Sequence, residues 1–240
     1  EGTEKKRMSG NETPTFSLIL PLYNEAGAIE GVVADLLRAF GERRYAFEIV
    51  LVVNGSLDGT GAVCDRIARG QPRIRVVRIP VNQGYGNGVL AGLGQARGEW
   101  VAFMAGDGQL AAADACAVAA EALEGRADLV KATRHGRSDS PYRRFQSGIY
   151  NWLVRTLFGL TSRDTHGIPK FLRRRDLERL QLSSRDWFLD DEVMIKARVL
   201  GFSVLEVPVH WGDRAAGKSH VRAVAVLEFL MNLAWYRLRE

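Results

Sequence analysis

Short apolar, β-branched segments alternate with segments of helical periodicity through the first half of the chain. Between the first two of them, apolar residues recur at helical spacing from Ile29 to Phe40. This alternation is typical of a parallel sheet whose strands are joined by crossover helices. We therefore predict an α/β fold with a mostly parallel sheet flanked by helices. The strands predicted here are Phe16–Leu20, Glu48–Val53, Ile74–Ile79 and Glu99–Met104.

The second half continues the sheet and then changes in pattern. A fifth strand is predicted at Asp128–Ala132 after an alanine-rich helix, Ala111–Leu123, and the stretch Thr161–Phe171 reads as irregular. No linker or repeat separates the halves, so we predict one folded domain, residues 16–220, after a disordered tail, residues 1–15. The further elements predicted are helices at Phe145–Phe158, Arg174–Leu180 and Asp190–Leu200, a strand at Phe202–Val209 and an amphipathic helix near the end, Val221–Arg239.

Charge is unevenly distributed along the 240 residues. The net charge is +5, yet residues 133–185 contain twelve Lys and Arg against four Asp and Glu. Such a segment suits phosphate groups or an anionic membrane surface. A merely solvated basic face is the alternative reading, because runs of charge are common on protein surfaces.

Cysteine usage and hydropathy exclude several classes of protein. Cys64 and Cys116 lie in helix-like surroundings without ligand spacing, so neither a disulfide framework nor a zinc site is indicated. No apolar stretch is long enough to span a bilayer. The most apolar one, Val221–Tyr236, is interrupted by charged and polar residues. We expect residues 221–240 either to lie on a membrane or to dock on the protein itself.

Polar, glycine-rich loops follow four consecutive predicted strands. The first two are Leu20–Glu25, with the sequence LPLYNE, and Asn54–Thr60, with the sequence NGSLDGT. Ligands of open parallel sheets bind outside the carboxyl ends of the strands, where these loops lie. Alone, the second loop reads equally well as a helix start capped by Asp58 or Thr60.

The third loop, Asn82–Gly88, has the sequence NQGYGNG and precedes a helix predicted at Val89–Ala96. Its glycines would permit close approach of the backbone to a phosphate at a helix N-terminus. The GxGxxG pattern is not satisfied, because Val89 stands where the last glycine is needed, so a dinucleotide-binding dehydrogenase is disfavoured.

The fourth loop carries Asp107 and Gln109 at the end of the Glu99–Met104 strand. A carboxylate and an amide oxygen two residues apart can bind one divalent cation together with substrate phosphates. A simple turn would explain this loop alone, but not four such loops in order.

In this order the four loops resemble those of family 2 glycosyltransferases, which have the Rossmann-like GT-A fold. Within that family, the chain is most similar to polyprenyl-phosphate sugar synthases of the dolichol-phosphate mannose or glucose type. The resemblance runs from about Phe16 to His220 and implies that Asp107 and Gln109 hold Mg²⁺ or Mn²⁺. It implies that Asp107 and Asp190 are catalytic. The nucleotide-binding residues that it implies are Pro21, Tyr23, Glu25, Asn54, Asn82 and Gly84.

Two positions depart from the family pattern. Asn54 stands where members of the family commonly have a carboxylate that recognises the nucleotide base, so the choice of nucleotide is left open. Ala105 replaces the first aspartate of the metal motif, which suggests weaker metal binding or lost activity.

Later motifs concern the acceptor. Arg163–Lys170 and Trp187–Glu192 resemble family stretches, the second of which implies that Asp190, and Glu192 less firmly, faces the active site. Capping of the following helix is the alternative for Asp191 and Glu192. His166 and His210 lack ligand spacing and read as structural. The residues implied to bind the acceptor phosphate are Arg134, Arg143, Ser147, Arg214 and Lys218.

The segment Gly212–Ser219 satisfies the P-loop pattern GxxxxGKS. Only 21 residues follow Ser219, too few for the strands and metal-binding aspartate that a P-loop protein needs downstream. We read the segment instead as the family's cationic loop, which lies beside the donor diphosphate or the lipid phosphate.

The sequence thus leads us to expect an inverting transferase that moves a sugar from a UDP- or GDP-sugar to a polyprenyl phosphate. Peripheral attachment at the cytoplasmic face of the membrane and no nucleic-acid partner are expected, while the oligomeric state is left open. Two alternatives stand beside this: a family 2 enzyme with a soluble hydroxyl acceptor, and a nucleotide-sugar binder without catalytic activity.

Overall fold

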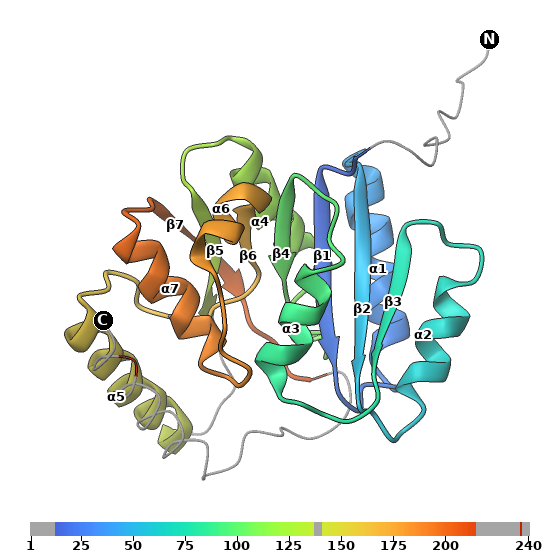
Figure 1. Ribbon diagram of the computed structural model, residues 1–240, viewed down its shortest axis with the longest axis horizontal. Helices are drawn as coiled ribbons and strands as arrows, with labels where there is room; N and C mark the ends of the chain where they lie inside the picture. The colour runs from blue at the N-terminus through green and yellow to red at the C-terminus, as the bar shows by residue number, and fades with distance from the viewer. Residues whose placement is uncertain (1–12, 137–140, 215–235, 237–240) are drawn as a thin grey trace.

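The structure, a computed structural model, describes residues 13–136, 141–214 and 236, with residues 141–146 described by their backbone alone. One sheet of seven strands has the order β3-β2-β1-β4-β6-β5-β7 (Figure 1). The strands are β1 Phe16–Leu22, β2 Phe47–Asn54, β3 Ile74–Ile79, β4 Trp100–Phe103, β5 Leu129–His135, β6 Lys170–Arg173 and β7 Val204–His210. The helices are α1 Ile29–Glu42, α2 Thr60–Ala68, α3 Tyr85–Leu93, α4 Ala112–Leu123, α5 Pro141–Phe158, α6 Arg174–Leu180 and α7 Leu189–Val199.

The predicted α/β class and the mostly parallel sheet are confirmed. Strand β3 and helix α6 have the predicted bounds, and the other predicted elements of the described part differ by a few residues at their ends. Helix α3 begins at Tyr85, four residues before the predicted start at Val89. Pro14 and Thr15 already form hydrogen bonds with residues at the edges of β2 and β4, so order begins before Phe16. The helix predicted from Val221 lies outside the described residues.

Strand β6 is the main element that the sequence interpretation lacked. It begins at the end of the stretch predicted to be irregular, Thr161–Phe171, and pairs antiparallel with β4 on one side and with β5 on the other. The other strand pairs of the described sheet are parallel. The carboxyl ends of β1, β2, β4 and β5 therefore meet at one edge, and the loops that follow them lie together.

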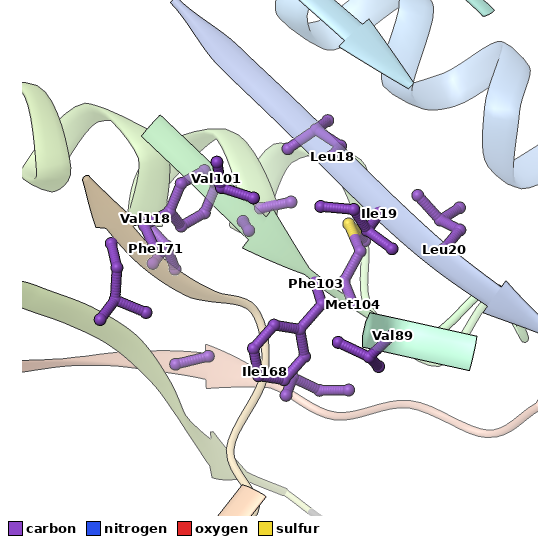
Figure 2. Close-up of a cluster of buried hydrophobic side chains, with 14 of the residues drawn as sticks. Leu18, Ile19, Leu20, Val89, Val101, Phe103, Met104, Val118, Ile168 and Phe171 are labelled. Atoms are coloured by element: carbon purple, nitrogen blue, oxygen red, sulfur yellow. The ribbon is translucent and has the colours of Figure 1, made fainter. Parts of the chain in front are cut away.

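Helices α1, α2 and α4 pack side by side on one face of the sheet, and α3 packs against β1 and β2 (Figure 1). Helix α1 shows why its sequence forms this layer: its buried residues, Ile29, Val33, Leu36 and Phe40, recur at helical spacing and face the core. Figure 2 shows Ile19 of β1 and Phe103 of β4, which are partners in the sheet register, within that core. No helix in the described ranges combines the length and apolar character needed to cross a bilayer.

A buried carboxylate ties the amino-terminal end of the sheet together, away from the strand-end loops. Glu48 at the start of β2 accepts a hydrogen bond from the Ser17 hydroxyl at 2.7 Å. It also accepts bonds from the backbone nitrogen and Nε of Arg97, at 2.7 and 2.9 Å. Burial acts to raise the pKa of Glu48, but these hydrogen bonds outweigh it and lower the pKa below its ordinary value of 4.5.

We expect this cluster to make folding stability depend on pH. Because the pKa of Glu48 is lower in the folded chain, its contribution is complete above about pH 4.5 and is lost as the pH falls through the folded-state pKa. Glu48→Gln should reduce the free energy of unfolding by about 2 kcal/mol at pH 7 and flatten its fall in acid. Urea unfolding at pH 7 and pH 4 would measure both; equal pH dependence in the two proteins would contradict this role.

Candidate active site

The loops that follow β1 and β2 are joined by side-chain hydrogen bonds. The Asn24 backbone nitrogen donates to Ser56 Oγ at 3.1 Å, and the Leu57 nitrogen donates back to Asn24 Oδ1 at 2.8 Å. The Glu25 nitrogen donates to Thr60 Oγ1 at 2.9 Å. Asn24 has a φ of 58°, a left-handed conformation that asparagine tolerates better than most residues. These bonds hold the side chain of Glu25 at the carboxyl edge of the sheet.

Three of the predicted site residues, from distant parts of the chain, form one ionic cluster. Arg214 Nη1 lies 3.3 Å from Glu25 Oε1, and its Nη2 lies 3.2 Å from Asp107 Oδ2. Burial and then the charge of Asp107 raise the pKa of Glu25 to about 7, although Arg214 opposes this. Glu25 Oε2 is buried with no hydrogen-bond partner among the described residues. The cluster thus has an incompletely paired carboxylate beside Asp107.

Asp107 and Gln109 present oxygen atoms of the kind that a divalent cation prefers. Asp107 Oδ1 accepts a bond from the Gln109 backbone nitrogen at 3.1 Å, and the Gln109 amide nitrogen donates to the Gly212 carbonyl at 3.0 Å. In the described part of the chain, no group of three or more His, Cys, Asp or Glu side chains is arranged to hold a metal ion. The residues therefore fit a cation that takes its further ligands from a bound diphosphate.

Arg214 was predicted to bind the acceptor phosphate, and it contacts Glu25 and Asp107, which were predicted to bind the nucleotide and the metal. This position favours the donor diphosphate, the other partner considered for the cationic loop. Lys218, predicted to act with it, lies outside the described residues, as does most of the segment that matched the P-loop pattern.

The residues predicted to contact the nucleotide do not all point to a ligand. The amide of Asn54 binds the neighbouring loop: Nδ2 donates to the Gly84 carbonyl at 2.8 Å, and Oδ1 accepts from the Gln83 nitrogen at 3.2 Å. Asn82 Oδ1 accepts from the Gly84 nitrogen at 2.9 Å. Asn54 and Asn82 thus shape the loop, while Pro21 and Tyr23 are half-buried at the end of β1.

The glycines of this loop allow a close contact with another backbone segment. A Cβ at Gly84 would lie 2.4 Å from the Arg185 carbonyl oxygen, and one at Gly86 would lie 2.4 Å from the Ser184 carbonyl oxygen. The Asn87 nitrogen donates to the Arg185 carbonyl at 3.0 Å. The close approach seen in the structure is therefore to the backbone of residues 184–186, which precede α7, and approach to a phosphate stays a prediction.

Gly86→Ala is expected to force these two segments apart and to lower the free energy of unfolding by about 1–3 kcal/mol. Chemical denaturation would measure the loss. Gly31→Ala is the matched control, because a Cβ at Gly31 in α1 has no atom within 4 Å. It should leave stability unchanged or raise it by up to about 1 kcal/mol. Similar stabilities for Gly86→Ala and the unaltered chain would contradict the packing role.

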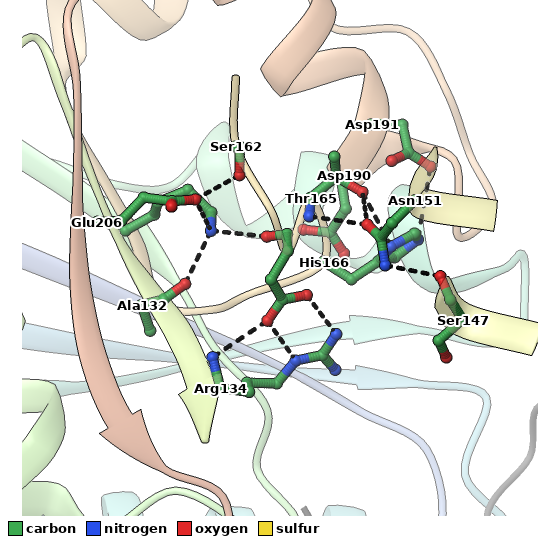
Figure 3. Close-up of polar contacts among 12 residues, drawn as sticks. Ala132, Arg134, Ser147, Asn151, Ser162, Thr165, His166, Asp190, Asp191 and Glu206 are labelled. Carbon is green, nitrogen blue, oxygen red and sulfur yellow. Dashed lines mark hydrogen bonds and ion pairs between the residues drawn. The ribbon is translucent and has the colours of Figure 1, made fainter. Parts of the chain in front are cut away.

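Arg134, the first of the predicted acceptor residues, forms a two-pronged ion pair. Its Nε and Nη2 donate to the two carboxylate oxygens of Asp164, at 2.8 and 2.6 Å. Ser147 lies half-buried on α5, where its carbonyl accepts a bond from Asn151, and Asn151 Oδ1 in turn accepts one from the nitrogen of Thr165, the residue after Asp164 (Figure 3). The side chain of Arg143 lies outside the description. The structure thus brings the Arg134 and Ser147 segments together.

Asp190 is buried at the first turn of α7 and paired with the fully buried Lys170 of β6. The Tyr85 phenol lies close by: burial and then the charge of Asp190 raise its pKa well above its ordinary value. The ring of Tyr85 stacks on Trp187 with centroids 4.5 Å apart. These contacts place Asp190 between Lys170 of β6 and Tyr85 at the start of α3.

Glu192, which was expected less firmly to face the site, turns away from it. Its carboxylate accepts bonds from the backbone nitrogens of Ser183 and Ser184 and pairs with Lys196 at 2.7 Å. Asp191 accepts a hydrogen bond from the Tyr150 hydroxyl at 2.5 Å and lies 3.5 Å from His166. Both carboxylates therefore anchor the segments around α7, and neither caps its first turn.

Sequence reasoning assigned no role to Lys131, Lys170 or Asp164. Lys131 and Lys170 lie opposite each other on β5 and β6, and both are fully buried. A lysine inside an otherwise apolar strand, as in Leu129–Ala132, is the available signal, because such a charge is seldom buried without a partner. No comparable signal marks Asp164 as the partner of Arg134.

A model of the family described as glycosyl transferase family 2 matches residues 17–181. Among curated relatives, the undecaprenyl-phosphate 4-deoxy-4-formamido-L-arabinose transferase of Shewanella sediminis is 27% identical, over 94% of this chain and 68% of its own length. The dolichyl-phosphate beta-glucosyltransferase ALG5A of Trichomonas vaginalis is 29% identical, over 86% and 68%. A further transferase of the first kind, from Pseudomonas fluorescens, is 26% identical, over 90% and 63%. The chain thus spans about two thirds of the length of these relatives.

Among solved structures, glucosyl-3-phosphoglycerate synthase from Mycobacterium tuberculosis superimposes well. Its complex with Mn²⁺, UDP and glucosyl-3-phosphoglycerate has a TM-score of 0.71 and 19% identity, over 93% of this chain and 80% of that one. The complex with Mn²⁺, UDP-glucose and glycerol 3-phosphate has a TM-score of 0.72 and 18% identity, with the same coverage. This likeness shows that the chain has the GT-A fold.

Proposed function

Because the chain belongs to glycosyl transferase family 2 and is a glycosyltransferase, we propose that it moves a sugar, with inversion, from a nucleotide diphosphate to a polyprenyl phosphate. The names of its curated relatives support this acceptor class, since they act on undecaprenyl phosphate and dolichyl phosphate. The product would be a polyprenyl-phosphate monosaccharide. UDP and GDP sugars are both retained as donors, because Asn54 binds its own loop and gives no ground for choosing the base.

The pairing of Asp190 with Lys170 is the observation that carries the choice of acceptor. A sugar or glycerol hydroxyl needs a general base to remove its proton during attack, whereas a phosphate is already ionised near neutral pH. The Asp190 carboxylate is buried against a fully buried ammonium group. Such a carboxylate is poorly placed to reach a hydroxyl acceptor, because the lysine ammonium occupies its Oδ1 and the side chain is almost entirely buried. The geometry therefore supports a phosphate acceptor over a hydroxyl acceptor.

In this proposal the catalytic power comes from positioning and charge neutralisation. Asp107 and Gln109 would hold Mg²⁺ or Mn²⁺, which neutralises charge on the departing nucleoside diphosphate. Arg214 lies against Asp107, where its guanidinium can reach the same diphosphate. An oxygen of the acceptor phosphate attacks the anomeric carbon as the bond to the diphosphate breaks. The groups proposed to bind the acceptor phosphate are Arg134, Arg143, Ser147 and Lys218.

The domain assignment and the site of action belong to the same proposal. Residues 16–220 would form the catalytic domain, and residues 221–240 would attach it to the cytoplasmic face of the membrane, where polyprenyl phosphate resides. Two observations support this: the name of a relative gives undecaprenyl phosphate as its acceptor, and residues 133–185 are strongly basic.

A mass-spectrometric screen of UDP- and GDP-sugars with a short polyprenyl phosphate tests the function. We expect one donor class to yield a polyprenyl-phosphate sugar in the presence of Mn²⁺. Sugar transfer to a soluble hydroxyl compound and none to the lipid would favour the soluble-acceptor alternative. Donor binding without transfer or hydrolysis would favour a binding protein. ATP or GTP binding with no response to any nucleotide sugar would overturn the proposal.

A further inference from the structure

The guanidinium of Arg134 is fixed in both position and orientation. Besides the two side-chain bonds to Asp164, the backbone nitrogen of Arg134 donates to Asp164 Oδ2 at 3.1 Å. The guanidinium carbon also lies 5.4 Å from the ring centroid of Trp211, over the face of the indole. One carboxylate and one aromatic ring therefore hold the plane of this guanidinium.

Asp164 is in turn held from inside the protein. Nζ of the fully buried Lys131 donates to the Asp164 carbonyl at 2.6 Å and to the Ala132 carbonyl at 2.9 Å. The same nitrogen lies 3.3 Å from Glu206 Oε1, which also accepts a hydrogen bond from Ser162. Figure 3 shows Ala132, Ser162 and Glu206 grouped on one side and Arg134 on the other. The backbone of Asp164 is thus held by Lys131 of β5, which is itself paired with Glu206 of β7.

The Asp164 carboxylate stays ionised in this position. Burial acts to raise its pKa, but the hydrogen bonds and charge of Arg134, with the charge of Lys131, hold the pKa well below its usual range. Arg134 and Asp164 together therefore carry no net charge. The pair presents N–H groups in a set direction and adds little long-range attraction for an anion.

We propose that Asp164 is a positioning residue for the acceptor phosphate, acting through Arg134. This inference rests on the proposed function, in which Arg134 binds that phosphate. Acceptor binding then depends mainly on the orientation of the Arg134 guanidinium and only secondarily on its charge. Arginine is suited to such a task, because its planar fork binds a carboxylate on one edge and directs its remaining N–H groups elsewhere.

Asp164→Asn distinguishes an effect of orientation from an effect of charge, because the two explanations predict opposite changes in the acceptor KM. The substitution removes a negative charge beside the site, so attraction by charge alone would lower the acceptor KM. Loss of the two-pronged pair releases the guanidinium, so we expect the acceptor KM to rise about tenfold or more. The donor dissociation constant, measured by calorimetry without acceptor, should stay unchanged. An acceptor KM that is unchanged or lower would overturn the proposal.

Two further variants separate this role from a structural one. Glu206→Gln removes a carboxylate of the same network that does not touch Arg134, and we expect it to leave the acceptor KM within about twofold. In an Arg134→Ala background, Asp164→Asn should raise the acceptor KM no further, since its effect passes through the guanidinium. A full additional increase there would contradict the inference.

Where Asp164→Asn does not fold, Asp164→Glu serves in its place. It keeps the charge and displaces the carboxylate by one methylene, so a raised acceptor KM supports positioning and an unchanged one opposes it. If the unaltered enzyme transfers no sugar to any polyprenyl phosphate, the proposed function has failed. If the unaltered enzyme transfers sugar and substitution of Asp164 leaves the acceptor KM unchanged, this inference alone has failed.

Discussion

Asp107→Asn is expected to lower the turnover number by on the order of 100-fold or more while leaving the fold intact. Asparagine has nearly the size of aspartate, so the loop after β4 keeps its packing. The lost charge removes both the partner of Arg214, now 3.2 Å away, and the strongest oxygen ligand that the site offers a cation. Product formation at saturating donor and acceptor, followed by mass spectrometry, would measure the loss.

The accompanying measurements identify the cause of that loss. Asp114→Asn, in the first turn of α4, removes a carboxylate outside the cluster and should leave turnover unchanged. Excess EDTA should suppress transfer by the unaltered enzyme, and Ala105→Asp should leave Mn²⁺ affinity unchanged or tighten it. Equal activity in EDTA and in Mn²⁺ would remove the cation role from Asp107 and Gln109.

Lys170→Met is expected to cost about 3–5 kcal/mol of unfolding free energy, the largest stability effect of any single change considered. Lys170 is fully buried and its partner Asp190 nearly so, which means that removing the ammonium leaves an unpaired charge in the core. Its contact with the Phe103 ring, 5.5 Å from nitrogen to centroid, is lost as well. Urea unfolding monitored by circular dichroism would give the value.

Two comparisons test this reasoning about Lys170. Lys196→Met breaks the ion pair of Lys196 with Glu192 and should cost clearly less than Lys170→Met, because Lys196 is 22% exposed and the Glu192 carboxylate keeps its bonds from the Ser183 and Ser184 nitrogens. The double variant Lys170→Met with Asp190→Leu removes both buried charges, and we expect it to recover most of the stability lost by the single change. A cost below about 1 kcal/mol for Lys170→Met would mean that water reaches the pair.

The parallel half of the fold follows from local pattern. Strands such as Ile49–Val53 are continuously apolar and β-branched, and the turn-forming residues after them end each strand clearly. Since parallel strands finish at one edge, the convergence of Glu25 and Asp107 follows from their places after β1 and β4. That part of the candidate site is predictable because each residue is placed by the strand immediately before it.

The acceptor side could not be derived in the same way. Strand β6 is four residues long, follows Pro169, and begins and ends with a charged residue, so no local pattern distinguishes it from a loop. Its identity as a strand depends on β4 and β5, which flank it from distant parts of the sequence. The pairs of Arg134 with Asp164 and of Lys170 with Asp190 depend on that placement, because side-chain partners from distant parts of the chain leave no mark in sequence spacing.

The contact of Gly84 and Gly86 with residues 184–186 restricts how this enzyme can be redesigned. The two segments approach each other backbone to backbone, so their shapes are complementary. If residues 82–88 were replaced by the loop of a relative with a larger residue at position 84 or 86, that side chain would clash with residues 184–186. Chimeras made to alter donor specificity should therefore exchange residues 82–88 and residues 183–188 together, although about a hundred residues separate the two segments along the chain.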